Sequence, residues 1–317
     1  MANIVILGGS FAGVSTAHRI LKGAAKTGAP VKITLVSPNT HFYWNIAAPR
    51  AIIPGQLADE KYFQPIAAGF SQYKPSQFEF IVASAESVDF ATKKGNLPFK
   101  TLGTTEATKD ALHDFQARVK KAKTIVVAGA GATGVETAGE LGFEYGTQKE
   151  IILIAGGSAI LEQAIPSVSK TATKLLEGLK VNIKYKTKVS GSAQTPEGRQ
   201  ELTLASGDKL VADLYISTFG LVPNSSYVPA KFLNANGFVT VDEYLKVKGT
   251  ENNIVLILTK KTPLPHKLGT KGMGLQIGRK AGTGHLGSIK LPGFLVSMLR
   301  KNLFVDNLPT TVNGSAF

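Results

Sequence analysis

The sequence has no cysteine among its 317 residues. This absence excludes a redox-active dithiol, a thiolate nucleophile, an iron–sulfur cluster held by thiolates and the covalent attachment of c-type haem. No apolar run approaches the roughly 18 residues of a membrane-spanning helix. The five histidines lack the spacing of metal ligands and no serine stands in a nucleophile elbow, so we expect neither a metal site nor a catalytic side chain.

Acidic residues are also few, with 22 Asp and Glu against 36 Lys and Arg, which gives a formal net charge of +14. An excess of this sign favours phosphorylated cofactors, anionic membrane surfaces, acidic partners or nucleic acid. The charge is spread along the chain, with no basic block beyond residues 120–123. A solvated lysine-rich surface is therefore the preferred interpretation, and nucleic-acid binding is not expected.

We expect no targeting segment, since the first apolar run begins almost at Met1, and Ala2 is incompatible with N-myristoylation. The expectation is a cytoplasmic protein. Residues 291–301 join apolar side chains to a basic end and predict a short amphipathic helix. Packing against the core is the preferred interpretation of this helix, and peripheral contact with mitochondrial or other membranes is the alternative.

Two glycine-rich turns are present, and each follows a short apolar run. Residues 4–7 lead into the turn at 8–13, and residues 125–128 lead into the turn at 129–134. In this pattern a buried parallel strand ends in a tight turn, and free N–H groups at the start of the next helix face a pyrophosphate. A protein that holds two such ligands can pass a hydride between them.

The two turns differ in detail. Gly129, Gly131 and Gly134 fill all three glycine positions of the second, whereas Ser10 takes the middle position of the first, where its hydroxyl can donate to a phosphate. A turn without a ligand is the alternative there. Neither second strand ends in the carboxylate that holds a ribose 2′-hydroxyl, and no arginine stands nearby to attract a 2′-phosphate. The choice between NADH and NADPH stays open.

The chain is long enough for two globular domains, with 43% apolar residues. Strand and helix patterns alternate in both halves, which predicts an α/β fold. The expected elements beyond the two turns are a strand at 78–84, helices at 108–121 and 166–179, a strand at 181–185, a hairpin at 201–210 and a strand at 213–220.

Residues 38–50 are aromatic and polar and follow a strand end, where a doubly wound sheet binds its ligand. The pattern predicts a wall for a flat ring system. Arg50 is a candidate for a cofactor phosphate because a guanidinium binds two oxygens at once, with a surface salt bridge as the alternative. Glu136 is a candidate for a cofactor contact, or an acid favoured by the helix dipole.

The order of these elements resembles the pyridine-nucleotide-disulfide oxidoreductase superfamily, and the details are similar to flavoproteins related to apoptosis-inducing factor, of the mitochondrion-associated-inducer and ferroptosis-suppressor type. The resemblance covers nearly the whole chain and rests on residues 8–13, 45–50, 129–141, 213–224, 237–242 and 303–305. It implies two Rossmann-like dinucleotide-binding domains and a small C-terminal α+β region. By position it implies an FAD-binding domain at 1–100, an NAD(P)H-binding domain at 101–222, a returning part of the FAD domain at 223–262 and a C-terminal interface region at 263–317.

For function the resemblance implies FAD at the first turn and NAD(P)H at the second, with electrons passed to a quinone or an electron-transfer-flavoprotein-like acceptor. Chemistry would reside in the flavin, so no catalytic side chain is assigned. The cofactor-binding residues that it implies are Gly8, Gly9, Ser10, Phe11, Ala12, Gly13, Arg50 and Ala85 for FAD, and Gly129, Gly131, Gly134 and Glu136 for NAD(P)H.

Two blocks of the family pattern are missing from this chain. Family members carry a hairpin and a strand ending in Ala-Thr-Gly before the second turn, whereas here residues 88–93 run directly into 94–99. They also carry an Ala-x-Gly-Asp run whose aspartate contacts FAD, followed by a helix, whereas residues 249–252 pass straight to 253–258. We therefore expect a flavin domain that has lost two blocks, by alternative splicing or an error in exon assignment. The alternative function is an NAD(P)H-binding protein with a defective flavin site.

Overall fold

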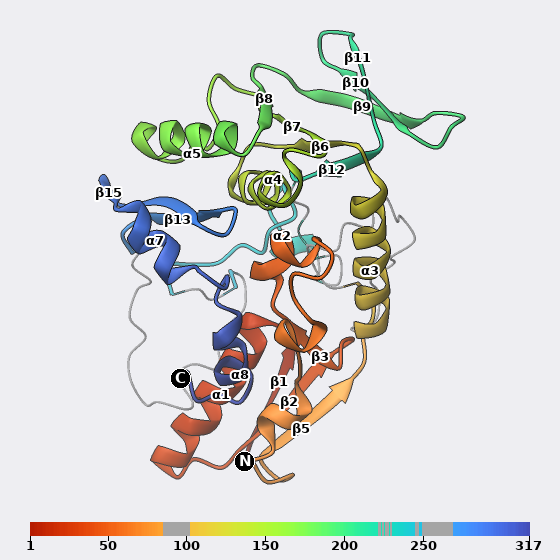
Figure 1. Cartoon of the computed structure of the whole chain (residues 1–317). Coiled ribbons are helices and arrows are strands. Elements are labelled where there is room, and N and C mark those ends of the chain that lie inside the picture. Colours follow the sequence, from red (N-terminus) through yellow and green to blue (C-terminus); the bar gives the residue numbers. More distant parts are fainter. Residues whose placement is uncertain are drawn as a thin grey trace.

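The computed structural model describes residues 1–84, 102–220 and 269–317, together with residues 223, 225, 228, 230–244 and 247–248. They form a first unit (residues 1–84), a second unit (residues 102–220) and a C-terminal segment (residues 269–317) that lies along one side of both units (Figure 1). The expected α/β fold class is confirmed.

The first unit is a three-stranded parallel sheet with one long helix and a small inserted hairpin. The strand order is β1-β2-β5, and all pairs are parallel. The long helix ends at Gly28, whose φ of 68° is the left-handed value that glycine adopts at a helix C-terminus. The elements are β1 (Ala2–Leu7), α1 (Phe11–Thr27), β2 (Val31–Ser37), β3 (His41–Tyr43), α2 (Ala48–Ala51), β4 (Phe63–Pro65) and β5 (Phe78–Val82).

The second unit is a four-stranded parallel sheet in the order β12-β6-β7-β8, beside which lies a separate antiparallel sheet β11-β10-β9. Four consecutive residues are buried in both β6 and β7, as expected for parallel strands covered on both faces. The predicted hairpin is confirmed, with Gly207 in its turn at a φ of 92°. The elements are α3 (Thr105–Lys121), β6 (Thr124–Ala128), α4 (Ala132–Tyr145), β7 (Glu150–Ile154), α5 (Pro166–Gly178), β8 (Val181–Lys184), β9 (Val189–Gln194), β10 (Gln200–Leu204), β11 (Lys209–Ala212) and β12 (Leu214–Ser217).

The C-terminal segment joins the two units. Its antiparallel sheet lies beside α4, and the chain then returns to the first unit, where His18 Nε2 lies 2.8 Å from the carbonyl oxygen of Val312. Lys22 donates to the carbonyl oxygens of Gly314 and Phe317, both at 2.8 Å. The elements are β13 (Gly272–Ile277), β14 (Ala281–Leu286), β15 (Ile289–Leu291), α7 (Gly293–Leu299) and α8 (Leu308–Val312).

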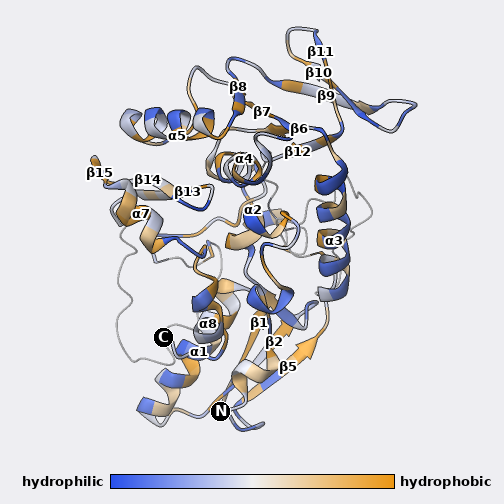
Figure 2. Cartoon of the chain, viewed as in Figure 1, coloured by the Kyte–Doolittle hydropathy of each residue, from blue (hydrophilic) through white to orange (hydrophobic). Residues whose placement is uncertain are grey.

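The short helix α7 has Val296 as its buried residue, which lies over Gly282 of β14, where a Cβ would be 3.1 Å from the Val296 side chain. Phe294, Met298 and Leu299 of this helix expose 76%, 63% and 57% of their surface, and Figure 2 shows the hydrophobic colours on it. The preferred interpretation of residues 291–301, an apolar face packed on the core, was wrong because the glycines of the sheet receive only the small Val296 side. Peripheral contact with membranes stays a prediction.

β1 stands at the edge of its sheet in the described part of the chain. Val5 and Leu7 on this strand expose 62% and 51% of their surface, and Val82 at the end of β5 exposes 54%. A doubly wound sheet normally has helices on both faces and strands on both sides of its first strand. Ala85 and half of residues 223–262 lie outside the described residues, and the expected domain boundaries stay predictions.

Candidate functional site

The two glycine turns have the same backbone geometry. Gly8 and Gly129 begin them with φ values of +104° and +110°, which side chains rarely allow. A Cβ on Gly13 or Gly134 would lie 1.8 Å or 1.7 Å from the carbonyl oxygen of the first glycine of the same turn. Strand end and helix therefore meet backbone to backbone in both units, as the packing of a dinucleotide turn requires.

Both turns lead into a helix whose first amide groups have no side-chain cap. Ser10 precedes α1 and Gly131 precedes α4, and neither makes a capping hydrogen bond. Both residues are exposed, as is Ala12, and a Cβ on Gly131 would meet nothing within 4 Å. Free amides at the positive end of a helix dipole bind anions such as a pyrophosphate.

The inner side of the first turn is closely packed. A Cβ on Gly9 would lie 2.7 Å from Ile66 Cδ1 and 2.9 Å from the side chain of Ser37. Packing against Ile66 and Ser37 therefore requires glycine at position 9. The outer side, with Gly8, remains exposed.

The aromatic residues expected to wall a ring site belong to the core instead. Phe42, Tyr43 and Trp44 expose only 0%, 3% and 5% of their surface. The Phe11 ring packs against Phe42 and Trp44, with centroids 4.8 Å and 4.9 Å apart, and the Trp44 indole N–H donates to the carbonyl of Leu303. The expectation was wrong because the hairpin of β3 and β4 turns these rings inward.

An open cleft of about 460 Å³ lies at the second turn. It runs from Gly131, at the start of α4, to Gly156 and Gly157 beyond the end of β7. A smaller and mainly apolar cleft of about 260 Å³ adjoins it and has Phe219 in its wall, whose surface is 53% exposed. Gly156 and Lys188 line both clefts.

Lys188 lies between the two clefts. The N–H of Thr187 donates to the carbonyl of Ala155 at 3.0 Å and fixes this stretch beside the end of β7. The methylene groups of Lys188 then pass over Gly156, where a Cβ would lie 3.1 Å from Lys188 Cε. Sequence reasoning missed this cation because it precedes β9 and is distant in the chain from the strand end that it covers.

Glu162 brings a carboxylate into the larger cleft. It lies against Gly157, where a Cβ would be 1.6 Å from Glu162 Oε1. It does not line the smaller cleft. Among the described residues, no group of three or more side chains is arranged to hold a metal ion.

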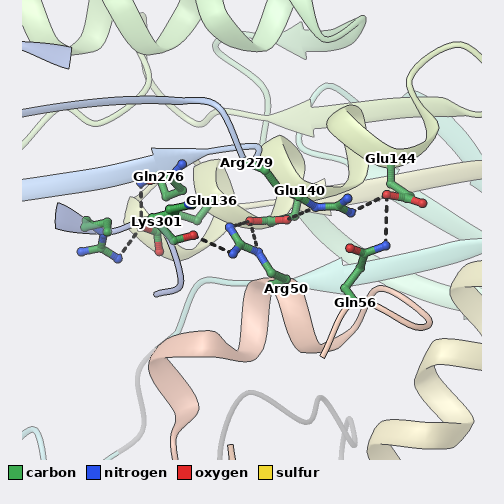
Figure 3. Close-up of polar contacts among 9 residues, drawn as sticks. Arg50, Gln56, Glu136, Glu140, Glu144, Gln276, Arg279 and Lys301 are labelled. Atoms are coloured by element: carbon green, nitrogen blue, oxygen red, sulfur yellow. Dashed lines mark hydrogen bonds and ion pairs between the residues drawn. The ribbon is translucent and has the colours of Figure 1, made fainter. Parts of the chain in front are cut away.

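Arg50 and Glu140 form a buried ion pair between the two units (Figure 3). The guanidinium donates from Nε and Nη2 to Glu140 Oε1, at 2.9 Å and 2.7 Å, and from Nη1 to the carbonyl of Lys301 at 2.9 Å. The two side chains expose only 6% and 1% of their surface. Arg50 therefore forms a salt bridge, which was the alternative to a cofactor contact, but this salt bridge is buried and not on the surface. Its contact with FAD stays a prediction.

Glu136 is buried one turn before Glu140 on α4. Its Oε1 accepts from Arg300 Nη2 at 2.8 Å and from the backbone N–H of Gln276 at 3.3 Å. Burial raises the pKa of Glu136 to about 7, while the Arg300 charge acts in the opposite direction. The expected contact of Glu136 with NAD(P)H stays a prediction.

Glu144 continues this row of carboxylates by one more turn of α4. It accepts hydrogen bonds from Arg279 and from Gln56 Nε2, the latter at 3.3 Å. Figure 3 shows the row, with side chains reaching α4 from the first unit and from the C-terminal segment. One helix therefore fixes all three parts of the molecule against each other.

Comparison with known proteins gives the family. The sequence pattern described as "Pyridine nucleotide-disulphide oxidoreductase" matches residues 66–254, more than half of the chain. This chain belongs to that family. It is an oxidoreductase, and its cofactors are FAD and NAD(P)H.

Similar proteins are found among fungi and vertebrates. Oxidoreductase ptaL of Pestalotiopsis fici is 51% identical over 370 positions, which cover 99% of this chain and 100% of that protein. Oxidoreductase phnG of Penicillium herquei is 33% identical and covers 76% and 69% of the two chains. Ferroptosis suppressor protein 1 of Homo sapiens is 24% identical over 99% of this chain and 96% of its own. The resemblance to flavoproteins of this type is confirmed.

The alignment with the Pestalotiopsis protein also bears on the missing blocks. It spans 370 positions, while this chain has 317 residues, so at least 53 positions have no residue here. These gaps support the loss of internal blocks.

Solved structures share the fold. A NAD-dependent persulfide reductase from A. fulgidus has a TM-score of 0.65 and 16% identity, and the match covers 89% of this chain and 63% of that one. The covalent putidaredoxin reductase–putidaredoxin complex has a TM-score of 0.60 and 18% identity, covering 89% and 80%. The expected pair of Rossmann-like domains is confirmed.

Proposed function

We propose that this chain transfers a hydride from NADPH to FAD and passes the electrons to a quinone or an electron-transfer protein. The pair of equivalent turns carries the proposal, because each joins a parallel strand to a helix with exposed and uncapped N-terminal amides. Two pyrophosphate sites in one chain bring a nicotinamide donor and a flavin into one molecule.

The residues of the chain bind and orient in this proposal. Gly9, Ser10 and Gly13 hold the pyrophosphate of FAD, and Gly131 and Gly134 hold that of NADPH. Bound flavin supplies the redox chemistry that no side chain of this cysteine-free sequence supplies. The ion pairs along α4 fix the distance between the two turns.

Lys188 favours the phosphorylated nicotinamide cofactor. The smaller cleft, with Phe219 in its apolar wall, suits a planar adenine, and the larger cleft at Gly131 suits the pyrophosphate. The ribose between these groups must pass Lys188, which lines both clefts. We therefore infer that the ammonium group of Lys188 contacts the 2′-phosphate of NADPH. Glu162 lines only the larger cleft. A ribose placed beside Glu162 rather than beside Lys188 would favour NADH.

Lys188→Ala is expected to weaken binding of 2′,5′-ADP roughly tenfold or more, because a hydrogen bond to a charged group contributes about 1.5–3 kcal/mol. Binding of 5′-ADP should stay unchanged. Isothermal titration calorimetry with both nucleotides measures the difference, and Lys170→Ala, which removes the same charge from α5, is the control. Equal weakening for both nucleotides would contradict a role in selecting the 2′-phosphate.

An electron-carrying acceptor is supported by the relatives. A reductase of the same fold has been solved in covalent complex with putidaredoxin. The absence of cysteine supports transfer onward from the flavin rather than to a dithiol of the chain.

The visible absorption spectrum of the purified protein tests the proposed function. Flavin bands that bleach on anaerobic addition of NADPH are expected. A colourless protein that cannot be reconstituted with FAD would contradict the proposal. It would support the alternative, an NAD(P)H-binding protein with a defective flavin site.

A further inference from the structure

A further open cleft, of about 720 Å³, lies in the second unit at the ends of the strands opposite to the glycine turn. Thr124, the first residue of β6, and Asp213, which directly precedes β12, both line it. The glycine turn follows the last residue of β6, about 16 Å away along the extended strand. Open parallel sheets bind their nucleotides beyond the carboxyl ends of the strands. The cleft is therefore separate from the cofactor clefts.

Four cations line this cleft. Arg118 and Lys121 come from the last turn of α3, Lys123 stands just before β6, and Arg199 lies in the loop between β9 and β10. Figure 2 shows hydrophilic colours at this end of α3 and in that loop. Three segments of the chain thus bring cations to one cavity, which we name the basic cleft. A cleft lined mainly by one sign of charge concentrates ions of the opposite sign.

The two carboxylates that line the basic cleft are already engaged. Asp213 accepts hydrogen bonds from Arg199 Nε at 2.8 Å and from the backbone N–H groups of Lys123 and Thr124 at 2.8 Å and 2.9 Å. The pKa of Glu197 is lowered, first of all by a hydrogen bond from its own backbone N–H, so this carboxylate is turned toward its own loop. Four cations against two carboxylates leave the cleft with a net charge of +2.

Three of the cations are available to a ligand. Arg118, Lys121 and Lys123 are exposed, and none of them belongs to a salt bridge among the described residues. The last carbonyl groups of α3 carry the negative end of the helix dipole, which would repel an anion. Lys149 Nζ offsets this charge, because it donates to two of the carbonyl oxygens there at 2.8 Å and 2.6 Å.

We propose that the basic cleft binds a chain of phosphate groups, either inorganic polyphosphate or the triphosphate of a nucleotide. Guanidinium and ammonium groups are the usual partners of phosphate oxygens. A phosphate chain carries charge along its length, which suits cations that come from three separate segments. No aromatic side chain is among the described residues that line the cleft, so a nucleobase would have no ring to stack on.

An acidic segment of another protein fits the basic cleft less well. Stable protein interfaces bury about 800 Å² on each partner and have aromatic anchors at their centre. The described lining of the cleft lacks such an anchor, and its volume lies in the range of small-molecule sites. The inference is independent of the proposed function, since the cleft is separate from the cofactor clefts.

Isothermal titration calorimetry of the full chain with inorganic tripolyphosphate, in a buffer free of divalent cations, tests the proposal. We expect saturable binding at one site per chain, and no saturable heat with sodium sulfate at the same ionic strength. No saturable binding of tripolyphosphate overturns the proposal.

Cytidine triphosphate separates the two sources of the phosphate chain. Affinity equal to that of tripolyphosphate assigns the triphosphate of a nucleotide as a ligand, and much weaker binding assigns inorganic polyphosphate. Both results support recognition of the phosphate chain. Binding of cytidine triphosphate without binding of tripolyphosphate would show that the base is recognised, and the proposal would fail.

Lys121→Gln combined with Lys123→Gln should weaken tripolyphosphate binding roughly tenfold or more, because two charge-assisted contacts are lost. Lys26→Gln combined with Lys120→Gln is the matched control. It removes the same charge from exposed positions of α1 and α3 that do not line the cleft, and it should leave the affinity unchanged at physiological ionic strength. Equal weakening in both double variants would mean attraction by the net charge alone and would overturn the proposal. Circular dichroism checks that the variants fold.

Two further titrations show where the anion binds. The affinity for tripolyphosphate should be unchanged in Lys188→Ala and in the presence of saturating 2′,5′-ADP. A loss of affinity in either case would assign the anion to the second glycine turn and overturn the proposal. Binding of a hexaglutamate peptide without binding of tripolyphosphate would assign the basic cleft to an acidic protein segment instead.

Discussion

Gly134→Ala should destabilise the protein by roughly 3 kcal/mol and abolish nucleotide binding at the second turn. The new Cβ would lie 1.7 Å from the Gly129 carbonyl oxygen and 2.7 Å from Thr218 Oγ1. Neither neighbour can yield, because Gly129 is held in the turn and Thr218 donates to the carbonyls of Ala128 and Gly129 at 3.0 Å. The clash can be relieved only if the first turn of α4 moves away from the strand, and this movement also displaces the free amide groups of that turn. Urea denaturation and NADPH fluorescence titration measure the two effects.

Gly131→Ala is the matched control, with the same change made three residues earlier. A Cβ there meets nothing within 4 Å, and the backbone at φ −77° and ψ −173° suits alanine. Ser10 already stands at the equivalent place before α1. Stability should change by no more than about 0.5 kcal/mol, while NADPH affinity falls because the methyl group faces the pyrophosphate.

The pair of variants separates packing from binding. Equal losses of stability would contradict the close helix contact at Gly134. Unchanged NADPH affinity in Gly131→Ala, with stability retained, would contradict a pyrophosphate site at this helix end.

The glycine turns could be predicted from the sequence because their requirement is local. Gly8 and Gly129 need a positive φ, and Gly13 and Gly134 need a missing Cβ, so the spacing itself encodes the geometry. The missing blocks were also predictable, since the order of motifs is a property of the sequence. The gaps against the Pestalotiopsis protein support that prediction.

Residues that meet across the fold could not be predicted. Arg50 and Glu140 are 90 residues apart, and the local sequence around neither residue marks the other as its partner. Lys188 lines the cleft at the second turn from a position just before β9, and nothing in its local sequence marks it. Periodicity located the apolar face of α7 but not its direction, because the direction depends on the glycines of the neighbouring sheet.

Arg50→Ala should lower the free energy of unfolding by about 3–5 kcal/mol, the usual cost of removing one partner from a buried ion pair. Glu140 exposes 1% of its side chain and would lose both hydrogen bonds from the guanidinium. Arg279 Nε, 3.9 Å from Glu140 Oε2, is too distant to replace them. The carboxylate would remain buried without its partner. Urea denaturation followed by circular dichroism at neutral pH measures the loss.

Two further variants show whether the loss of stability in Arg50→Ala comes from the burial of the ion pair or from the loss of a short ion pair as such. Arg50→Met combined with Glu140→Leu removes both charges and should recover most of the lost stability, since apolar groups of similar volume replace the pair. Arg199→Ala breaks the ion pair with Asp213, which is as short at 2.8 Å but has side chains 45% and 26% exposed, and should cost only about 0–1 kcal/mol. Arg50→Ala could instead lower the free energy of unfolding by no more than Arg199→Ala does. That result would mean that water reaches Glu140 and that the contact of α4 with the first unit is not buried.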